Sequence, residues 1–277
     1  MTHSLLRRRG FKLVELLVVV SIIVIVLAFM LPYNRRVRGA AARMSCGNNL
    51  KQIGMACHSY VETSPKSEAL PGGSIVGSAK EPTDRLSVFV TLLPYLEQNE
   101  RYKKFDLAKG WSDQQDLGHF IYPPPYHCPI DPTPESAKHT TYVAVAGVGS
   151  DAPTLPLTDK RAGAFGFDRV VRLEDIKDGT SNTLLFLETH HETGPWPSAG
   201  TATLRGIDPD DETPVGKGRA FGIHHAASEW NWGRMPGECN AVLADGSVRT
   251  LKANLSAEVL SALATIAGGE DVSVMDW

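Results

Sequence analysis

The fold is decided by residues 13–31, LVELLVVVSIIVIVLAFML, which contain no glycine or proline and only two polar residues, Glu15 and Ser21. A helix of this length, at about 1.5 Å per residue, extends about 28 Å, close to the ~30 Å hydrocarbon core of a bilayer. The stretch therefore predicts one transmembrane helix over residues 13–31. A buried helix of a soluble core is the alternative.

Charges on the two sides of this stretch do not orient it. Positive residues favour the cytoplasmic side of a membrane helix. Four precede the stretch and four follow it: Arg7, Arg8, Arg9 and Lys12, then Arg35, Arg36, Arg38 and Arg43. Over all 277 residues, the 42% hydrophobic and 21% charged content is typical of a globular protein, and the net charge of -3 gives no general attraction to nucleic acid. Nucleic acid is not expected as a partner.

Three kinds of N-terminal segment fit these features: a cleaved secretory signal, an uncleaved anchor and a prepilin leader. Arg8-Arg9 and the small residues 40–42 suit a secretory signal cleaved after Ala42. Glu15 and the arginines between residues 33 and 39 argue against it. An ionised carboxylate in hydrocarbon costs at least a few kcal/mol, so Glu15 requires a partner.

The stretch Gly10-Phe11-Lys12-Leu13-Val14-Glu15 resembles the processing site of type IV pilins and type II secretion pseudopilins. The resemblance implies a leader over residues 1–10, cleavage between Gly10 and Phe11, and methylation of the Phe11 amine by a prepilin peptidase/methyltransferase. It also implies that Glu15 pairs with the N-terminal ammonium of a neighbouring subunit. It places the protein in the inner membrane as a single-pass chain, with its head on the extracytoplasmic side.

A helix is predicted over residues 11–62, with a kink at Pro32, where proline removes a backbone hydrogen bond. Simple termination at Pro32 is the alternative. Further along, apolar residues recur at steps of three and four, which indicates one buried stripe, and Ser64-Pro65 ends the helix. The stripe consists of Cys46, Leu50, Ile53, Cys57 and Tyr60-Val61.

The resemblance extends along the chain to a large bacterial family of prepilin-type proteins. Five motifs carry it: SCGNNLKQIG at 45–54, LLPYLEQ at 92–98, CPID at 128–131, DGTSNT at 178–183 and ADGSVR at 244–249. The family has a C-terminal signature in which a histidine stands nine residues ahead of Asp-Gly. Here 19 residues separate His225 from Asp245-Gly246, and residues 226–236 read as an inserted loop.

The fold class expected for the whole is α+β and pilin-like, with the long helix packed on an antiparallel sheet in a head formed by residues 63–277. Asp245-Gly246 is interpreted as a two-residue hairpin turn within the region 219–251. A last helix is predicted over residues 257–267, with Ser256 as its cap. Strands are predicted at 142–148, 164–171, 183–189, 219–223, 240–243 and 247–251.

The four cysteines allow one geometric exclusion. Cys46 and Cys57 are eleven residues apart on one helix, hence about 16 Å apart, which is too far for a disulfide. The family motifs favour Cys46 with Cys128 in an oxidising compartment. Four reduced, buried thiols are the alternative.

Few residues indicate chemistry. Asp208, Asp210 and Asp211 offer oxygen ligands for calcium, although a solvated acidic loop is the preferred reading. The histidine pairs 190–191 and 224–225 would bind a transition metal only with a carboxylate such as Glu188 or Glu192. No nucleophile elbow, zinc-protease helix or phosphate-binding loop is present, so an enzyme is not expected.

The sequence thus predicts a non-enzymatic, pilin-like subunit that assembles with other pilin-like subunits through its N-terminal helix, without a cofactor. The alternative is a membrane-anchored, exported binding protein that uses the prepilin route but does not polymerise.

Overall fold

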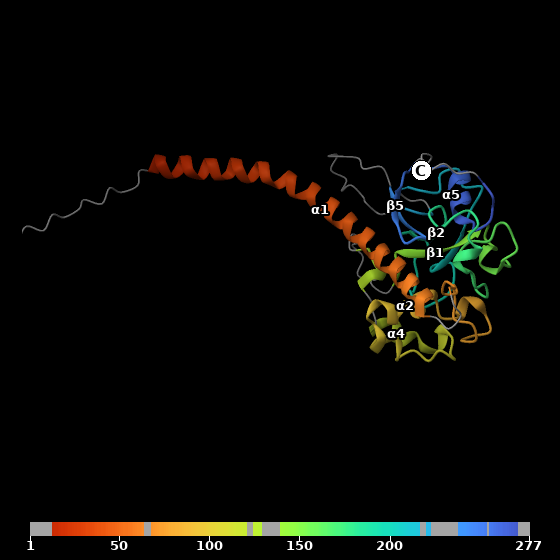
Figure 1. Cartoon of the computed structure of the whole chain (residues 1–277). Coiled ribbons are helices and arrows are strands. Elements are labelled where there is room, and N and C mark those ends of the chain that lie inside the picture. Colours follow the sequence, from red (N-terminus) through yellow and green to blue (C-terminus); the bar gives the residue numbers. More distant parts are fainter. Residues whose placement is uncertain are drawn as a thin grey trace, which may run out of the picture. The chain divides into compact units, whose positions relative to one another are not determined.

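The computed structural model describes residues 13–63, 68–120, 124–128, 139–216, 220–222, 238–253 and 255–270, except the side chains at 28–40, 42, 118–120 and 124. Contacts divide the chain into two units, Met1–Ala42 and Arg43–Trp277. Helix α1 (Leu13–Thr63) begins in the first unit and ends in the second, one residue beyond the predicted end at residue 62 (Figure 1).

The second unit contains a five-stranded sheet and has the expected α+β class. The strand order is β3-β1-β2-β4-β5, and three of the four pairings are antiparallel. The strands are β1 (Tyr142–Val148), β2 (Leu184–Glu188), β3 (Leu204–Ile207), β4 (Cys239–Leu243) and β5 (Val248–Leu251).

The prediction of a fully antiparallel sheet is wrong at one edge, because β3 pairs with β1 in parallel. In the sheet, β2 lies between β1 and β4, so neither of its edges is open to β3. The chain that leaves β2 therefore passes to the other edge of β1 and forms β3 there. β3 was not predicted. It has only four residues, one of them Gly206, and its alternation is too short to read as a strand.

Helices cover the two faces of this sheet. Leu50 and Ile53 of α1 belong to one buried cluster with inward-facing residues of β1, β2 and β4, including Ala144, Phe186 and Val242. On the opposite face, helix α5 (Ala257–Ala264) contributes Leu260 and Leu263 to a second cluster. Val143, Leu187 and Leu243 are among its sheet residues.

Strands β1, β2, β4 and β5 form within one or two residues of the predicted ranges. The helix predicted at 257–267 is α5, and the Ser256 hydroxyl accepts from Val259 N, which confirms the cap. α5 ends three residues earlier than predicted. Of the strand predicted at 219–223, the structure describes residues 220–222, in which Phe221 forms an isolated bridge with Val215.

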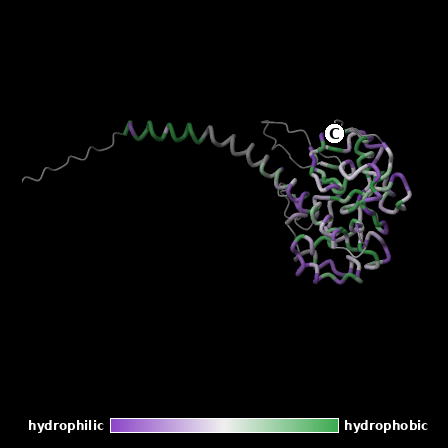
Figure 2. The backbone as a smooth tube through the Cα atoms, in the orientation of Figure 1, coloured by the Kyte–Doolittle hydropathy of each residue, from purple (hydrophilic) through white to green (hydrophobic). Residues whose placement is uncertain are grey.

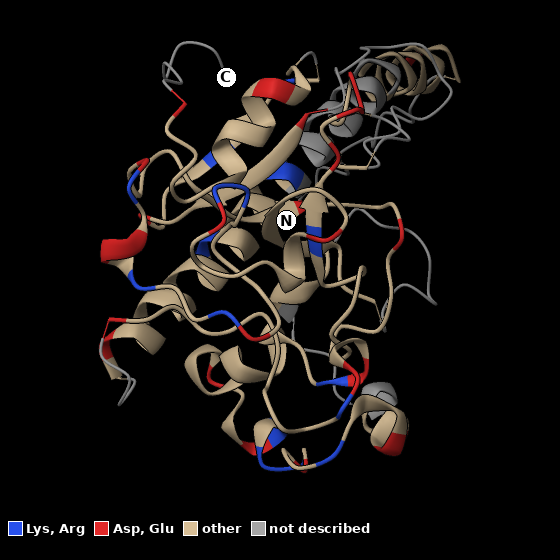
Figure 3. Ribbon diagram, turned by 90° about the vertical axis from the view of Figure 1, so that its right-hand side faces the viewer, with Lys and Arg blue, Asp and Glu red and all other residues tan. Residues whose placement is uncertain are grey.

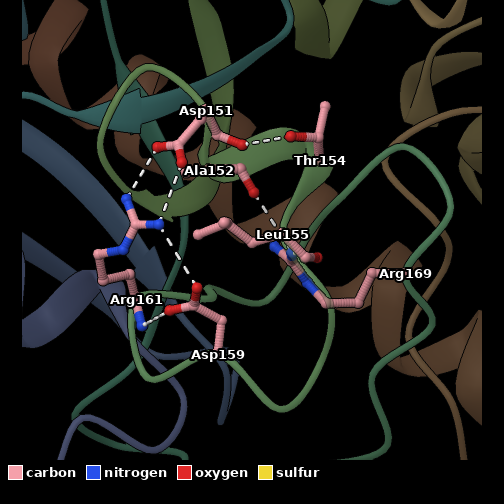
Figure 4. Close-up of polar contacts among 7 residues, drawn as sticks. All are labelled: Asp151, Ala152, Thr154, Leu155, Asp159, Arg161 and Arg169. Carbon is pink, nitrogen blue, oxygen red and sulfur yellow. Dashed lines mark hydrogen bonds and ion pairs between the residues drawn. The ribbon is translucent and has the colours of Figure 1, made fainter.

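The strand predicted at 164–171 is wrong, and Arg169 gives the reason. Its buried guanidinium donates to the carbonyls of Ala146, Leu155 and Phe165, and to Ala152 O at 3.3 Å. Figure 4 shows Arg169 among these loops, beside the Arg161–Asp151 ion pair. The Arg169 side chain thus ties residues 164–171, an irregular and largely buried loop, to β1 and to residues 152–155.

Short helices lie between α1 and β1 and in the loops that follow β1. The α-helices are α2 (Val88–Leu92), α3 (Asn99–Tyr102) and α4 (Gln115–Phe120). Among the described residues, 3₁₀ turns cover Pro82–Asp84, Leu93–Leu96, Trp111–Gln114, Pro124–Tyr126, Ala152–Thr154 and Leu173–Asp175.

Candidate functional site on the N-terminal helix

The first part of α1, residues 13–27, is called here the exposed segment. Its large apolar side chains are between 46% and 79% exposed, on all sides of the helix. Figure 2 shows this segment as a coil that is mostly green, with a hydrophilic stretch near its start. A helix that is apolar all round normally lies in a core or in lipid, so this segment requires a partner. Within the described residues, no helix is both long and apolar enough to cross a membrane.

Two polar residues interrupt the exposed segment. Ser21 Oγ donates to Leu17 O at 2.7 Å, so its hydroxyl is satisfied inside its own helix. Glu15 lies in the first turn of α1 and is exposed. The amide dipoles of a helix favour a carboxylate at this end. Gly10 and Phe11, the predicted processing residues, lie outside the described residues.

Pro32 does not end the helix. α1 continues through residue 32 to Thr63, so the alternative of simple termination is wrong. The predicted kink at Pro32 stays a prediction.

The later part of α1, residues 46–61, is called here the docked segment. The predicted stripe is confirmed except at Tyr60, which is only partly buried: Cys46, Leu50, Ile53 and Cys57 are fully buried, and Val61 is 8% exposed. Arg43, one turn before this segment, pairs with Glu238 at 2.9 Å. Burying such a stripe is what fastens an amphipathic helix to a core. The exposed segment of α1 thus has no apolar partner among the described residues, whereas the docked segment of the same helix packs on the sheet.

The docked segment meets the Asp245-Gly246 hairpin at two glycines. A Cβ on Gly54 would lie 2.7 Å from Val242 Cγ2 and 3.7 Å from Gly246 Cα. Lys51 Nζ donates to Gly246 O at 2.7 Å. The helical motif at 45–54 and the hairpin motif at 244–249 thus contact each other directly. Their small residues allow helix and hairpin backbones to approach closely.

Asp245-Gly246 is a turn, as predicted, but the loop has three residues, 244–246, instead of two. Leu243 N donates to Ser247 O, and Gly246 alone in the loop has a positive φ of 77°. A two-residue type I′ turn would need a positive φ at both central residues. Asp245 Oδ1 accepts from Ser247 N at 2.8 Å, which closes the turn.

Asp245 is also held by the DGTSNT motif. Its backbone N donates to Thr180 O, and Ala244 N donates to Thr183 O. Partial burial raises the Asp245 pKa, but hydrogen bonds from Ser247 and Ser181 and the charge of Arg249 outweigh it, so the pKa is lowered. Asp245 therefore acts as a turn residue that joins two motifs.

A disulfide links the docked segment to the CPID motif. Cys46 and Cys128 are joined, with their Cα atoms 5.2 Å apart, and this is the pair favoured by the family motifs. Cys57 and Cys239 are free and buried. Tyr142 of β1 donates to Cys46 O, and Cys128 N donates to Oγ1 of Thr141, the residue before β1, at 2.7 Å, so the start of β1 contacts both ends of the bridge.

A model of a protein family described as "Protein of unknown function (DUF1559)", SBP_bac_10, matches residues 35–258, well over half of the chain. The chain belongs to the DUF1559 family. The match includes the docked segment and all five motifs, and it begins after the exposed segment. No curated protein and no solved structure matches the chain.

The most unusual buried group of this DUF1559 chain is Glu188, at the end of β2. It is 1% exposed, and Asn240 binds both of its oxygens, from N at 2.8 Å and from Nδ2 at 3.2 Å. Burial raises the pKa of Glu188 to about 8, although the Asn240 hydrogen bonds oppose this. Its carboxylate and the sulfurs of Cys46 and Cys128 lie within 4.8 Å of one another. The sequence offered Glu188 as a partner for histidines, but the structure places it beside the disulfide.

The other sequence candidates do not converge in the described part of the chain. Asp208 Oδ1 accepts from Asp210 N, and Asp211 Oδ1 accepts from Thr213 N, so these carboxylates stabilise their own loop. Asp208, Asp210 and Asp211 form no cluster of three metal-ligating groups there. His225 lies outside the described residues, as does His224.

Charged residues of the second unit are dispersed. Figure 3 shows basic and acidic ribbon segments interspersed in the view it gives. Several form local pairs, such as Arg85 with Asp168 and Arg161 with Asp151. The Arg161–Asp151 pair is exposed and contributes little to stability, whereas Arg85 is largely buried. The candidate functional site is therefore α1, with an exposed segment and a docked segment that carry different roles.

Proposed function

We propose that this DUF1559 chain is a pilin-like or pseudopilin-like subunit whose exposed segment inserts among the corresponding helices of neighbouring subunits, or into the inner membrane before assembly. The observation that carries the proposal is the contrast within α1: apolar residues 13–27 are exposed on every side, whereas residues 46–61 bury a single stripe on the sheet. An apolar helix in water is unfavourable by about 25 cal/mol per Å² of apolar surface, so contact with lipid or other helices is strongly favoured.

Glu15 supports assembly over simple anchoring. It is the acidic residue in the first turn of the apolar helix. In a low-dielectric environment an ion pair between this carboxylate and a neighbouring N-terminal ammonium would be much stronger than in water. Cleavage between Gly10 and Phe11 would create that ammonium five residues from Glu15, counting both ends. A membrane anchor alone has no need for this carboxylate.

In this proposal the docked segment fixes the position of each head relative to its own assembled helix. The disulfide and the buried stripe hold residues 46–61 on the sheet. Repeated contacts between exposed segments that do not close into a ring would form an open helical filament. In this proposal the motifs at 45–54, 128–131, 178–183 and 244–249 have a structural role.

N-terminal peptide mapping tests the processing step. The protein would be extracted from membranes of its own host, and its mature N-terminus and intact mass determined by mass spectrometry. The proposal predicts a chain that begins with methylated Phe11. A chain that begins at Met1 or Thr2 would indicate an uncleaved anchor, and one that begins at Arg43 a secretory signal; either result would overturn the filament proposal.

A further inference from the structure

Three metal-ligating groups meet beneath the docked segment. Cys46 comes from α1, Cys128 from the loop before β1, and Glu188 from the end of β2. Their exposed fractions are 0%, 1% and 1%, and their ligand atoms all lie within 4.8 Å of one another. Segments far apart in sequence thus bring two sulfurs and one carboxylate to a single buried point.

Glu188 has no cationic partner among the described residues, and there its carboxylate accepts hydrogen bonds from Asn240. A buried carboxylate without a cation is unfavourable. Each carboxylate oxygen can accept more than one hydrogen bond or ligand contact, so the Asn240 bonds leave lone pairs available. A buried carboxyl group directed at two sulfurs is also an unusual neighbour for a purely structural disulfide.

We propose that, when the Cys46–Cys128 disulfide is reduced, the two cysteine sulfurs and a Glu188 oxygen form a binding site for Zn²⁺ or another thiophilic divalent cation. Reduction by a dithiol converts the disulfide to two thiols and leaves the reductant as its own disulfide. Cation binding then releases both thiol protons, and the proton of Glu188 where its carboxyl group is protonated, to the solvent. Two thiolates and a carboxylate are suitable zinc ligands, and a fourth tetrahedral position would hold water.

Hydrogen bonds that involve neighbouring side chains hold the segments that carry the three donors, in addition to the sulfur–sulfur bond. Tyr142 Oη donates to Cys46 O at 3.3 Å, and Cys128 N donates to Thr141 Oγ1. Thr250 Oγ1 donates to Asn240 Oδ1 at 2.9 Å, which orients the Asn240 amide toward Glu188. Such outer contacts fix ligand orientation in metal sites. The site is independent of how the exposed segment assembles.

The test uses the full-length chain in detergent, reduced with a dithiol and kept under anaerobic conditions, with Co²⁺ and Zn²⁺ as probes. The proposal predicts one Co²⁺ per chain with a thiolate-to-cobalt charge-transfer band, and its displacement by Zn²⁺. Cys46→Ser, Cys128→Ser and Glu188→Gln should each weaken binding about tenfold or more. Cys57→Ala, which removes a buried cysteine outside the cluster, should leave binding unchanged.

A second measurement needs no substitution. Zn²⁺ should protect Cys46 and Cys128 of the reduced wild-type chain from alkylation, while Cys57 and Cys239 keep their labelling rates. The proposal would be overturned if no charge-transfer band appeared, or if Glu188→Gln bound the cation as tightly as the wild type. It would also be overturned if Zn²⁺ left the alkylation rates of Cys46 and Cys128 unchanged.

Discussion

The two segments of α1 are parts of one helix, yet they follow different rules. In the exposed segment Leu17 is 61% exposed, whereas Leu50 in the docked segment is fully buried. The exposed segment has apolar residues in every direction, while the docked segment buries one apolar stripe and leaves Met55 exposed. The comparison teaches that a continuous helix does not have one environment: its sequence pattern decides locally whether it packs on its own head or requires a partner outside the chain.

The largest effect is expected from removing the disulfide that fastens the docked segment. The bridge spans 82 residues, so the double variant Cys46→Ser/Cys128→Ser should lower the free energy of unfolding of the head by about 2–5 kcal/mol. Denaturant unfolding followed by tryptophan fluorescence measures this change. A double variant as stable as the wild type would show that the stripe alone fastens the helix.

A matched pair of leucines tests the comparison directly. Leu50→Ala should destabilise the head by about 2–5 kcal/mol because it leaves a cavity at a fully buried site. Leu17→Ala, at an exposed site, should change the unfolding free energy of the head by less than about 0.5 kcal/mol. Equal effects of the two substitutions in the same denaturation assay would contradict the division of α1 into two segments.

Two helical glycines sharpen the account of the docked segment. Gly54→Ala should lower the unfolding free energy by about 1–3 kcal/mol, because its Cβ would lie 2.7 Å from Val242 Cγ2. At Gly47 the nearest atom is 3.9 Å from the added Cβ, so Gly47→Ala should stabilise the helix by up to about 1 kcal/mol. Differential scanning calorimetry separates the two cases. Stabilisation by Gly54→Ala would mean that helix and hairpin are not in close contact.

A pH dependence of stability is expected from Glu188 in the disulfide-bonded, metal-free protein. Burial raises its pKa from 4.5 to about 8, so between these values the folded chain binds more protons than the unfolded chain. The contribution of Glu188 to the free energy of unfolding is therefore fully present below pH 4.5. It is lost as the pH rises through 8, by at most about 1.4 kcal/mol per pH unit.

Glu188→Gln removes this titration, so the difference in unfolding free energy between variant and wild type should change with pH over that window. Denaturation curves recorded from pH 5 to 9 measure it. A constant difference across the range would show that Glu188 does not titrate as its burial implies.

Much of the fold follows from local pattern. The stripe at residues 46–61 follows from helical periodicity, and β1, β2, β4 and β5 follow from short strand-like runs bounded by turn residues. The strand predicted at 164–171 does not form, because the guanidinium of Arg169 is buried among the carbonyls of Leu155 and Phe165, contacts that have no signal in the sequence pattern. β3 was missed because four residues carry too little alternation.

The candidate site was less readable than the fold. Glu15 stands out in the sequence because an acid in an apolar run is anomalous. Glu188 was associated with the wrong ligands, since nothing in the sequence shows that β2 ends beside Cys46 and Cys128. The turn at Asp245-Gly246 was recognised, but its third residue depends on backbone dihedrals that composition does not specify.

The most direct test of the central claim compares the two polar residues of the exposed segment. Glu15→Ala and Ser21→Ala would be expressed in the native host, and assembled complexes separated from single subunits by native electrophoresis after mild extraction. Because Ser21 is satisfied by Leu17 O, Ser21→Ala should assemble like the wild type. Glu15→Ala should reach the membrane but lose its assemblies. Normal assembly of Glu15→Ala would contradict the account and favour a membrane-anchored binding protein.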